Sequence, residues 1–201
     1  MRHGGIVTRR IGAGLVALFF LACLSWVATG EEMKALRPLI GKGEKAPVFT
    51  LDTLEGKSLT FRPKTGKPAV VVFWSAFCPL CREMAPGIRD IFRRYGDSIR
   101  FLGVNLDGNR FRNAVRSFVR EYDWNIPLVL DDIRNDFFIA SDPYGIMKTP
   151  TAIVVDGNGT VWGVYAAEKM TGLVRDFDRI ASEIHEGSNI VKKPPARIPS
   201  G

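Results

Sequence analysis

The sequence is poor in the residues that form disulfide frameworks and bind metal ions: it contains three cysteines and two histidines. So few cysteines exclude the small secreted folds that are held together by several disulfides. A structural zinc site needs about four ligands. Besides Cys78 and Cys81, the chain offers only Cys23, His3 and His185. We therefore predict no metal site.

Acidic residues are also under-represented, since 21 Asp and Glu face 28 Lys and Arg, and the formal net charge is +7. Part of the excess lies at the two ends of the chain: Arg2, Arg9 and Arg10, and Lys192, Lys193 and Arg197. No basic stretch is interleaved with aromatic residues, as nucleic-acid-binding surfaces are. We therefore expect no nucleic-acid partner.

Long apolar runs are absent with one exception, Ile11 to Ala28. A basic start with Arg9 and Arg10, this run, and the small residues at 28–30 together are typical of an export signal. We therefore predict that residues 1–30 direct the rest of the chain out of the cytoplasm and are then removed.

Two other interpretations of this leader stay open. The run is about as long as the shortest membrane-spanning helices, so residues 11–28 could form an uncleaved anchor in the inner membrane. Arg9 and Arg10 would then keep the N-terminus in the cytoplasm. A lipid-modified Cys23 is the third interpretation. All three place the domain in the periplasm.

The chain is organised around residues 69–95. Ala69 to Trp74 is a short apolar run rich in β-branched residues, which predicts a strand buried on both faces. Cys78-Pro79-Leu80-Cys81 follows and opens a helical pattern. The apolar residues that recur at helical spacing are Met84, Ile88, Ile91, Phe92 and Tyr95. Two thiols are therefore expected where a buried strand leads into a helix.

This position favours thiol chemistry. The N–H groups and the dipole at a helix N-terminus stabilise an anion, and cysteines placed there can have their pKa lowered from about 8.5 to roughly 3.5–7.5. The Cβ atoms of helical residues three positions apart are about 5–6 Å apart, which a modest adjustment brings into disulfide range. We predict that Cys78 attacks a partner disulfide and that Cys81 resolves the mixed disulfide. The redox-active Cys78–Cys81 pair then needs no other cofactor. Two inert structural cysteines are the alternative.

The segment from Val72 through Cys78-Pro-Leu-Cys81 to Pro86, together with Lys148-Thr149-Pro150-Thr151, resembles the thioredoxin superfamily. The closest resemblance is to its exported TlpA/ResA-like branch of thiol–disulfide oxidoreductases, over about residues 44 to 185. This resemblance implies a three-layer thioredoxin-like α/β fold with a mixed central sheet, an N-terminal β-hairpin and a central α/β insertion.

The resemblance also implies the substrate-binding residues. Pro150 is expected to follow a cis peptide bond, which places the Thr149 backbone beside Cys78 to pair with a substrate strand. Trp74, Pro79 and Leu80 are expected to be further substrate contacts.

The sequence departs from that family at two positions. Val72 stands where classical thioredoxin has a buried Asp, so the usual proton relay for the resolving thiol is missing. Met84 stands where many TlpA/ResA-like proteins have a Glu. Glu83 is shifted by one residue, about 100° around the helix, and is expected to face solvent.

The predicted organisation is a leader (1–30), a polar connector (31–45), a thioredoxin-like domain (46–186) and a disordered tail (187–201). Strands are expected at 46–51, 58–61, 69–74, 99–105, 127–130, 151–155 and 160–164, and further helices at 111–122, 132–140 and 173–184. We interpret Asn105, Asp107 and Asn109 as a helix-capping turn rather than a calcium loop, since later acidic ligands are absent.

The predicted function is reduction of periplasmic protein disulfides, for example those of apocytochrome c, by a monomer that a membrane electron donor reduces again. A peroxidase-like redoxin is the alternative, because Ser75 lies three residues before Cys78. A non-enzymatic copper-binding module on the same scaffold is the further alternative.

Overall fold

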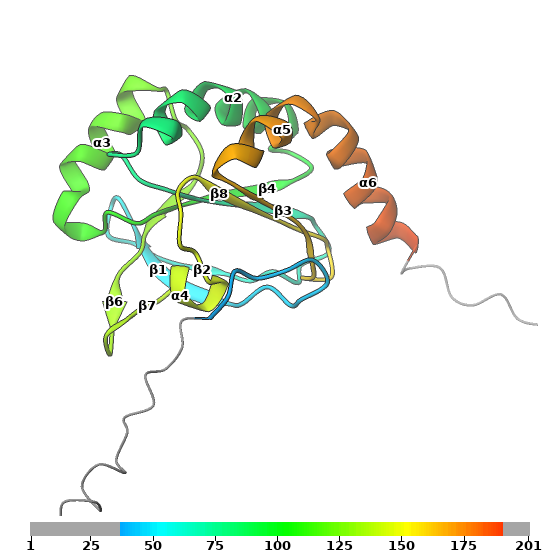
Figure 1. The fold of residues 1–201 in the computed structure, drawn as a ribbon, viewed down its shortest axis with the longest axis horizontal. Coiled ribbons are helices and arrows are strands. Elements are labelled where there is room, and N and C mark those ends of the chain that lie inside the picture. Colours follow the sequence, from blue (N-terminus) through cyan, green and yellow to red (C-terminus); the bar gives the residue numbers. More distant parts are fainter. Residues whose placement is uncertain (1–36, 191–201) are drawn as a thin grey trace, which may run out of the picture. The chain divides into compact units, whose positions relative to one another are not determined.

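The computed structural model describes residues 37–190, with side chains through residue 185 (Figure 1). The predicted leader and the last eleven residues of the predicted tail, 191–201, lie outside the described residues. The strands are β1 (Phe49–Thr53), β2 (Ser58–Phe61), β3 (Ala69–Trp74), β4 (Arg100–Asn105), β5 (Leu128–Leu130), β6 (Ile133–Arg134), β7 (Phe137–Phe138), β8 (Thr151–Val155) and β9 (Val161–Ala166). The helices are α2 (Pro79–Tyr95), η1 (Asn109–Phe111), α3 (Arg112–Glu121), α4 (Ser141–Tyr144), η2 (Ala167–Lys169), α5 (Met170–Arg175) and α6 (Phe177–Ile190).

The main sheet has seven strands in the order β2-β1-β5-β4-β3-β8-β9. Strand β4 is parallel to β3 and to β5, and the remaining neighbours are antiparallel. The N-terminal hairpin β1–β2 extends the sheet beyond β5. The predicted fold class, with a mixed central sheet and an N-terminal hairpin, is confirmed.

Strand β3 explains why the sheet has a core on each face. Its six residues are all buried, and alternate side chains point to opposite faces. Val70, Val72 and Trp74 belong to one apolar cluster, and Val71 and Phe73 to the other. Figure 1 shows α2, α3, α5 and α6 over the first face, and α4 with the N-terminal segment over the second. The carboxyl end of β3 is therefore fixed by packing on both faces of the sheet.

The helix predicted at 132–140 is wrong: this segment forms the β6–β7 hairpin, followed by α4. Ile133, Phe137 and Ala140 have helical spacing, which misled the prediction. The backbone at Asn135 and Asp136 has positive φ, as a two-residue hairpin turn of type I′ requires. This hairpin and α4 form the part of the central insertion between β5 and β8.

Asp131 fixes the base of this hairpin. Its side chain is buried and accepts hydrogen bonds from the N–H of Ala140 at 3.0 Å and of Ser141 at 2.9 Å. The Ser141 hydroxyl donates to the same carboxylate at 2.6 Å, and the N–H of Asp132 at 3.0 Å. One buried carboxylate therefore holds both the start of the hairpin and the start of α4.

Three predicted boundaries need correction. Residues 37–45, expected to be a connector, pack on the domain: Ile40 is buried, and its N–H donates to Tyr144 O at 3.0 Å. The predicted closing helix is two helices, α5 and α6, because the chain turns at Asp176. Helix α6 runs to Ile190, four residues into the predicted tail.

Among residues 37–190, no helix has the length and apolar character that crossing a membrane requires. The apolar run at 11–28 lies outside this range.

Candidate active site

The two thiols lie where β3 gives way to α2, in a segment we call the active-site turn (residues 75–81). Cys78 is the N-cap of α2 and has an extended backbone, and Pro79 occupies the first turn of the helix. The Cys81 N–H donates to Cys78 Sγ at 3.3 Å. Cys78 is half-buried and Cys81 is buried, and both are free thiols. The more accessible sulfur therefore lies at the positive end of the helix dipole.

The two thiols have opposite pKa shifts. Burial is the main cause that raises the pKa of Cys81 to about 12; a hydrogen bond from the Ser75 backbone opposes this rise, and the neighbouring Cys78 adds to it. Burial also opposes ionisation of Cys78. The pKa of its thiol nevertheless lies below the usual value, because hydrogen bonds from the side chains of Cys81 and Thr149 and from the backbone N–H groups of Cys81 and Leu80 together outweigh the effect of burial. The thiolate therefore forms first at Cys78.

A second segment faces these thiols. The Thr149–Pro150 peptide bond is cis, as predicted. The Cys78 thiol donates to Thr149 O at 3.4 Å, so the Thr149 backbone lies beside the sulfur. Thr151 Oγ1 donates to Lys148 O at 2.9 Å and closes the same turn. We call residues 147–150 the cis-proline loop.

A third segment, which the sequence interpretation missed, supports the active-site turn from β4. Asp107 accepts hydrogen bonds from Ser75 Oγ at 2.6 Å and from Ala76 N at 2.7 Å. Asn105 is fully buried, and its side chain donates to Asp107 at 2.9 Å while accepting the Asp107 N–H at 3.0 Å. Asp107 therefore fixes the backbone immediately before Phe77 and Cys78.

The predicted capping role of this loop is wrong, because neither η1 nor α3 has a side-chain N-cap. The described residues contain no group of acidic, histidine or cysteine side chains that could hold a metal ion. One signal could have found the contact. Asn105 and Asp107 end the strand beside β3, and the carboxyl ends of parallel neighbours lie at the same edge of the sheet.

Exposed apolar side chains surround the thiols. Phe77 and Phe111 are 56% and 44% exposed and meet edge to face, with ring centroids 5.2 Å apart. Met147, in the cis-proline loop, is 69% exposed. Pro79 is exposed and Leu80 half-buried, both at the mouth of the turn. This surface is accessible to a partner protein.

Trp74 does not belong to that surface. Its side chain is buried and packs on Phe118 and Trp124, with ring centroids 4.4 and 5.5 Å away. The prediction that Trp74 contacts a substrate is incompatible with this burial, and the residue instead supports the turn from below.

The residues that depart from the thioredoxin pattern lie either in the apolar core or on the surface. Val72 is buried in the same core cluster as Cys81, and Met84 packs against that cluster. Glu83 is exposed, as predicted. No described carboxylate is among the causes of the raised Cys81 pKa, which comes mainly from burial.

Comparisons with known proteins agree with this geometry. A model of the AhpC/TSA family matches residues 42–164. The thiol-disulfide oxidoreductase ResA of Halalkalibacterium halodurans is 30% identical over 142 residues, which span 70% of this chain and 77% of that protein.

Two solved structures share the fold. The thioredoxin domain of a thiol-disulfide oxidoreductase from Bacteroides vulgatus has a TM-score of 0.57 at 24% identity, covering 69% of this chain and 98% of that one. A secreted Mycobacterium tuberculosis disulfide oxidoreductase homologous to E. coli DsbE has a TM-score of 0.51 at 26% identity, covering 63% and 94%. The chain therefore belongs to the AhpC/TSA family, and within it to the thioredoxin-like thiol–disulfide oxidoreductases related to ResA.

Proposed function

We propose that this protein is an exported reductant of protein disulfides, with Cys78 as the nucleophile and Cys81 as the resolving thiol. The observation that supports this assignment best is the opposite pKa shift of the two thiols, lowered at Cys78 and raised at Cys81. The nucleophile in thiol–disulfide exchange is the thiolate, so the more accessible and more acidic sulfur reacts first.

The proposed reaction has two steps. The Cys78 thiolate attacks one sulfur of the client disulfide, forming a Cys78–client disulfide and releasing the other client sulfur as a thiolate. Cys81 then loses its proton, and its thiolate attacks Cys78 Sγ, forming the Cys78–Cys81 disulfide and releasing the second client thiol. The client gains two electrons and two protons, and the protein loses them. A membrane dithiol donor would restore the reduced pair.

The cis-proline loop would position the client. Because Thr149 O lies 3.4 Å from Cys78 Sγ, a client strand paired with the Thr149 backbone has its disulfide near the attacking sulfur. Pro150, Pro79 and Leu80 form the proposed contact surface around it.

Export is the second part of the proposal. The basic and apolar leader supports it, and the relative described as secreted in M. tuberculosis is consistent with it. A fusion of residues 1–30 to a reporter that is active only outside the cytoplasm should be active. Reporter activity confined to the cytoplasm would overturn the periplasmic role and the proposed link to cytochrome c maturation.

The peroxidase alternative is less well supported. The Ser75 hydroxyl donates to Asp107 at 2.6 Å, so it is engaged in holding the turn rather than directed at a peroxide beside Cys78. No observation on the described residues favours the copper-binding alternative.

The direction of the reaction is tested by equilibration of the pure protein with glutathione redox buffers. We expect a reduction potential in the reducing half of the range between about −270 mV and about −120 mV. In native cells, a Cys81→Ser variant should accumulate mixed disulfides with exported client proteins. A potential near −120 mV would instead identify the protein as an oxidant.

A further inference from the structure

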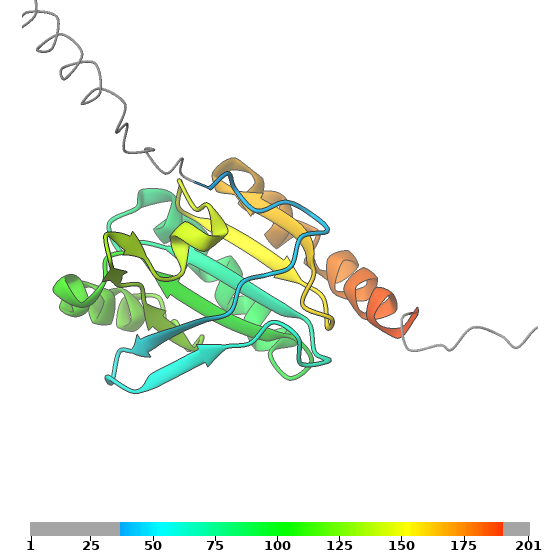
Figure 2. The same cartoon turned by 90° about the horizontal axis from the view of Figure 1, so that it is seen from below.

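Strand β9 is the last strand of the sheet, and only part of its outer edge is covered by the described residues. At Val161 the N-terminal segment pairs with it: Gly43 N donates to Val161 O and Val161 N to Glu44 O, both at 2.8 Å. The segment is then held elsewhere, with Ile40 N bonded to Tyr144 O. Figure 2 shows this segment (blue) beside β9 before it crosses the sheet to β1. From residue 162 to 166, no strand of the described residues pairs with the outer edge.

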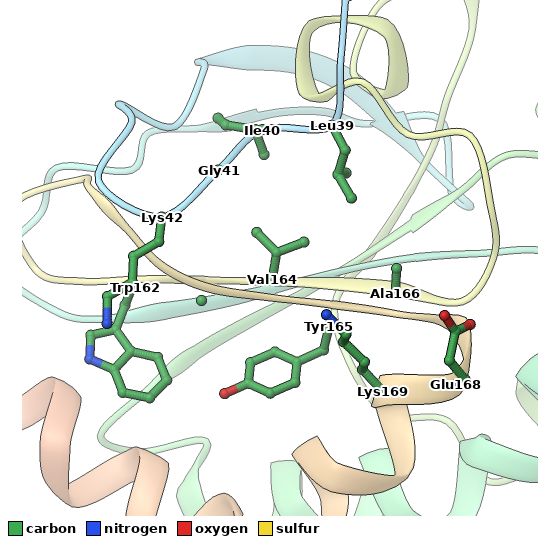
Figure 3. A pocket seen from close by; sticks show the side chains of 11 residues that line it. Leu39, Ile40, Gly41, Lys42, Trp162, Val164, Tyr165, Ala166, Glu168 and Lys169 are labelled. Atoms are coloured by element: carbon green, nitrogen blue, oxygen red, sulfur yellow. The ribbon is translucent and has the colours of Figure 1, made fainter.

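A groove of about 520 Å³ lies between this part of β9 and residues 39–42 (Figure 3). Leu39 points from the segment toward β9, and Val164 points back toward the segment. Trp162 and Tyr165 lie on the opposite side of β9. The groove therefore combines the backbone of an edge strand with apolar side chains on both sides of it.

These features are those of a site for an extended peptide. An edge strand presents unpaired N–H and C=O groups to a further strand, and alternate side chains of the added strand enter pockets on either side. Residues 162–166 span about 16 Å at roughly 3.3 Å per residue, enough for four or five residues of an added strand.

The end of β9 at Ala166 adjoins the cis-proline loop. At one end, Ala167 N donates to Pro150 O at 2.7 Å, and Ala166 pairs with Thr151 in the sheet. Thr149, the next residue back, contacts the Cys78 sulfur through its carbonyl oxygen. The outer edge of β9 therefore ends one strand away from the loop that contacts Cys78.

We propose that this groove binds an extended segment of the client protein beside the cysteine that Cys78 attacks, adding it as a further strand to β9. The proposal rests on the proposed function, because it requires a client bound at the cis-proline loop. It adds a second binding region, whose recognition depends on client backbone several residues from the disulfide.

Charges at the ends of the groove indicate which segments fit. The Lys42 ammonium lies 5.4 Å from the centre of the Trp162 ring at one end, and Lys169 lies with Glu168 at the other. The lining has two lysines and one glutamate, so it favours alternating apolar segments with an acidic residue over segments with basic residues.

The test uses the full-length protein with Cys23→Ser and Cys81→Ser, so that Cys78 is the only reactive thiol and the reaction stops at the mixed disulfide. The probes are synthetic peptides with one cysteine in disulfide linkage to thionitrobenzoate, whose release reports attack. One peptide is short, and two others are extended by about eight alternating valine and threonine residues, on the N- or the C-terminal side. A further pair contains the same extensions with N-methylated backbones.

We expect one extended peptide to react about tenfold faster than the short one at subsaturating concentration, equivalent to two net backbone hydrogen bonds. N-methylation should remove this advantage. In the mixed disulfide with that peptide, the amides of residues 162–166 should exchange hydrogen more slowly than with the short peptide.

Matched surface variants locate the effect. Leu39→Asp places a charge in the groove and should remove the advantage of the extended peptide. Val48→Asp makes the same kind of change at a residue that is 57% exposed and outside the groove lining, and should leave the advantage intact.

Equal rates for short and extended peptides, or an advantage that survives N-methylation, would overturn the β9 proposal while leaving the proposed function standing. If no peptide reacts, the proposed function itself is contradicted and the β9 proposal with it.

Discussion

The active-site turn and the β6–β7 hairpin are built on the same plan and differ in where their support comes from. Each follows the carboxyl end of a strand of the main sheet, and in each an aspartate accepts the N–H groups of the following backbone. For the hairpin, the aspartate is Asp131, which directly follows its own strand β5. For the active-site turn it is Asp107, which follows the neighbouring strand β4.

This difference has a functional meaning. Asp131 is buried, and it belongs to the same loop as the β6–β7 hairpin whose backbone it holds. Asp107 holds Ser75 and Ala76 from outside the turn, so the residues from Phe77 to Leu80 need no acidic side chain of their own and can face a partner. Changes in the active-site turn should therefore lower the reactivity of Cys78, whereas changes at the base of the hairpin should lower the stability of the fold.

The largest expected effect is the loss of reactivity in the active-site turn. Cys78→Ser should abolish reduction of protein disulfides, because no other described thiol is both accessible and acidified. Cys81→Ser should still attack but stop as a mixed disulfide. Non-reducing gels with a disulfide-containing client distinguish the two, with Cys23→Ser as the control that keeps both cysteines. Capture of clients by Cys78→Ser would reverse the assignment.

The next effect is the pH dependence of the two thiols. Alkylation of Cys78 in the reduced protein should rise with pH and reach its midpoint below that of an ordinary exposed cysteine, because its pKa is lowered by hydrogen bonds that outweigh burial. Cys81 should stay protonated until the pH approaches about 12. At pH 7 we expect Cys78 to be modified about a hundredfold faster or more, as measured by mass spectrometry of peptides after iodoacetamide. Faster labelling of Cys81 would contradict the assigned roles.

Removal of the hairpin's aspartate should reduce stability strongly. Asp131→Ala leaves the N–H groups of Ala140 and Ser141 without their acceptor in a buried place, which should lower the free energy of unfolding by about 2–4 kcal/mol. Urea titration measures this loss. Asp132→Ala, at the exposed neighbouring position, should cost less than about 1 kcal/mol. If Asp131→Ala changes the alkylation profile of Cys78 while leaving stability unchanged, the comparison between the two turns fails.

Removal of the active-site aspartate should have a smaller effect, and it should change reactivity rather than stability. Asp107→Ala removes the acceptor of Ser75 Oγ and Ala76 N, and we expect disulfide exchange to slow by about tenfold. Asp107→Asn retains one acceptor oxygen and should restore most of the rate. Asp97→Ala, an exposed change at the far end of α2, is the matched control. Equal rates in Asp107→Ala and wild type would show that the turn needs no support from β4.

The smallest expected effect is stabilisation of the hairpin turn. Asp136 has φ of 64° and follows Asn135 in the turn, and Asn-Gly is the preferred pair for this turn type. Asp136→Gly should therefore raise the free energy of unfolding by a few tenths to about 1 kcal/mol. Asp132→Gly, outside the positive-φ positions, should not.

The sequence predicts best the features that depend on neighbouring residues along the chain. Strands β2, β3 and β8 begin and end where the apolar patterns predicted, because a strand buried in a sheet needs its own apolar residues. The cis bond before Pro150 was expected from the family resemblance that Lys148-Thr149-Pro150-Thr151 helps to carry, and it is present.

Features that depend on distant partners were missed. Asp107 contacts Ser75 only because Trp74 pairs with Asn105 in the parallel register of β3 and β4. Trp74 is buried because Phe118 and Trp124 cover it, and no local pattern shows that. The helix predicted at 132–140 failed for a different reason, since helical apolar spacing was given more weight than the Asn135-Asp136 turn.

The N-terminal segment also has a mechanical consequence. Residues 37–45 are attached to the domain at two places, through Ile40 at Tyr144 and through Gly43 and Glu44 at Val161. Gly145 lies directly under Pro38: a Cβ at Gly145 would be 2.2 Å from Pro38 O. Tension applied to the chain upstream of Arg37 therefore loads the junction of α4 and the cis-proline loop first, and the edge of β9 second. The Ser75–Asp107 contact lies outside this load path, so the turn that holds Cys78 keeps its geometry while the proposed client-binding side of the site bears the force.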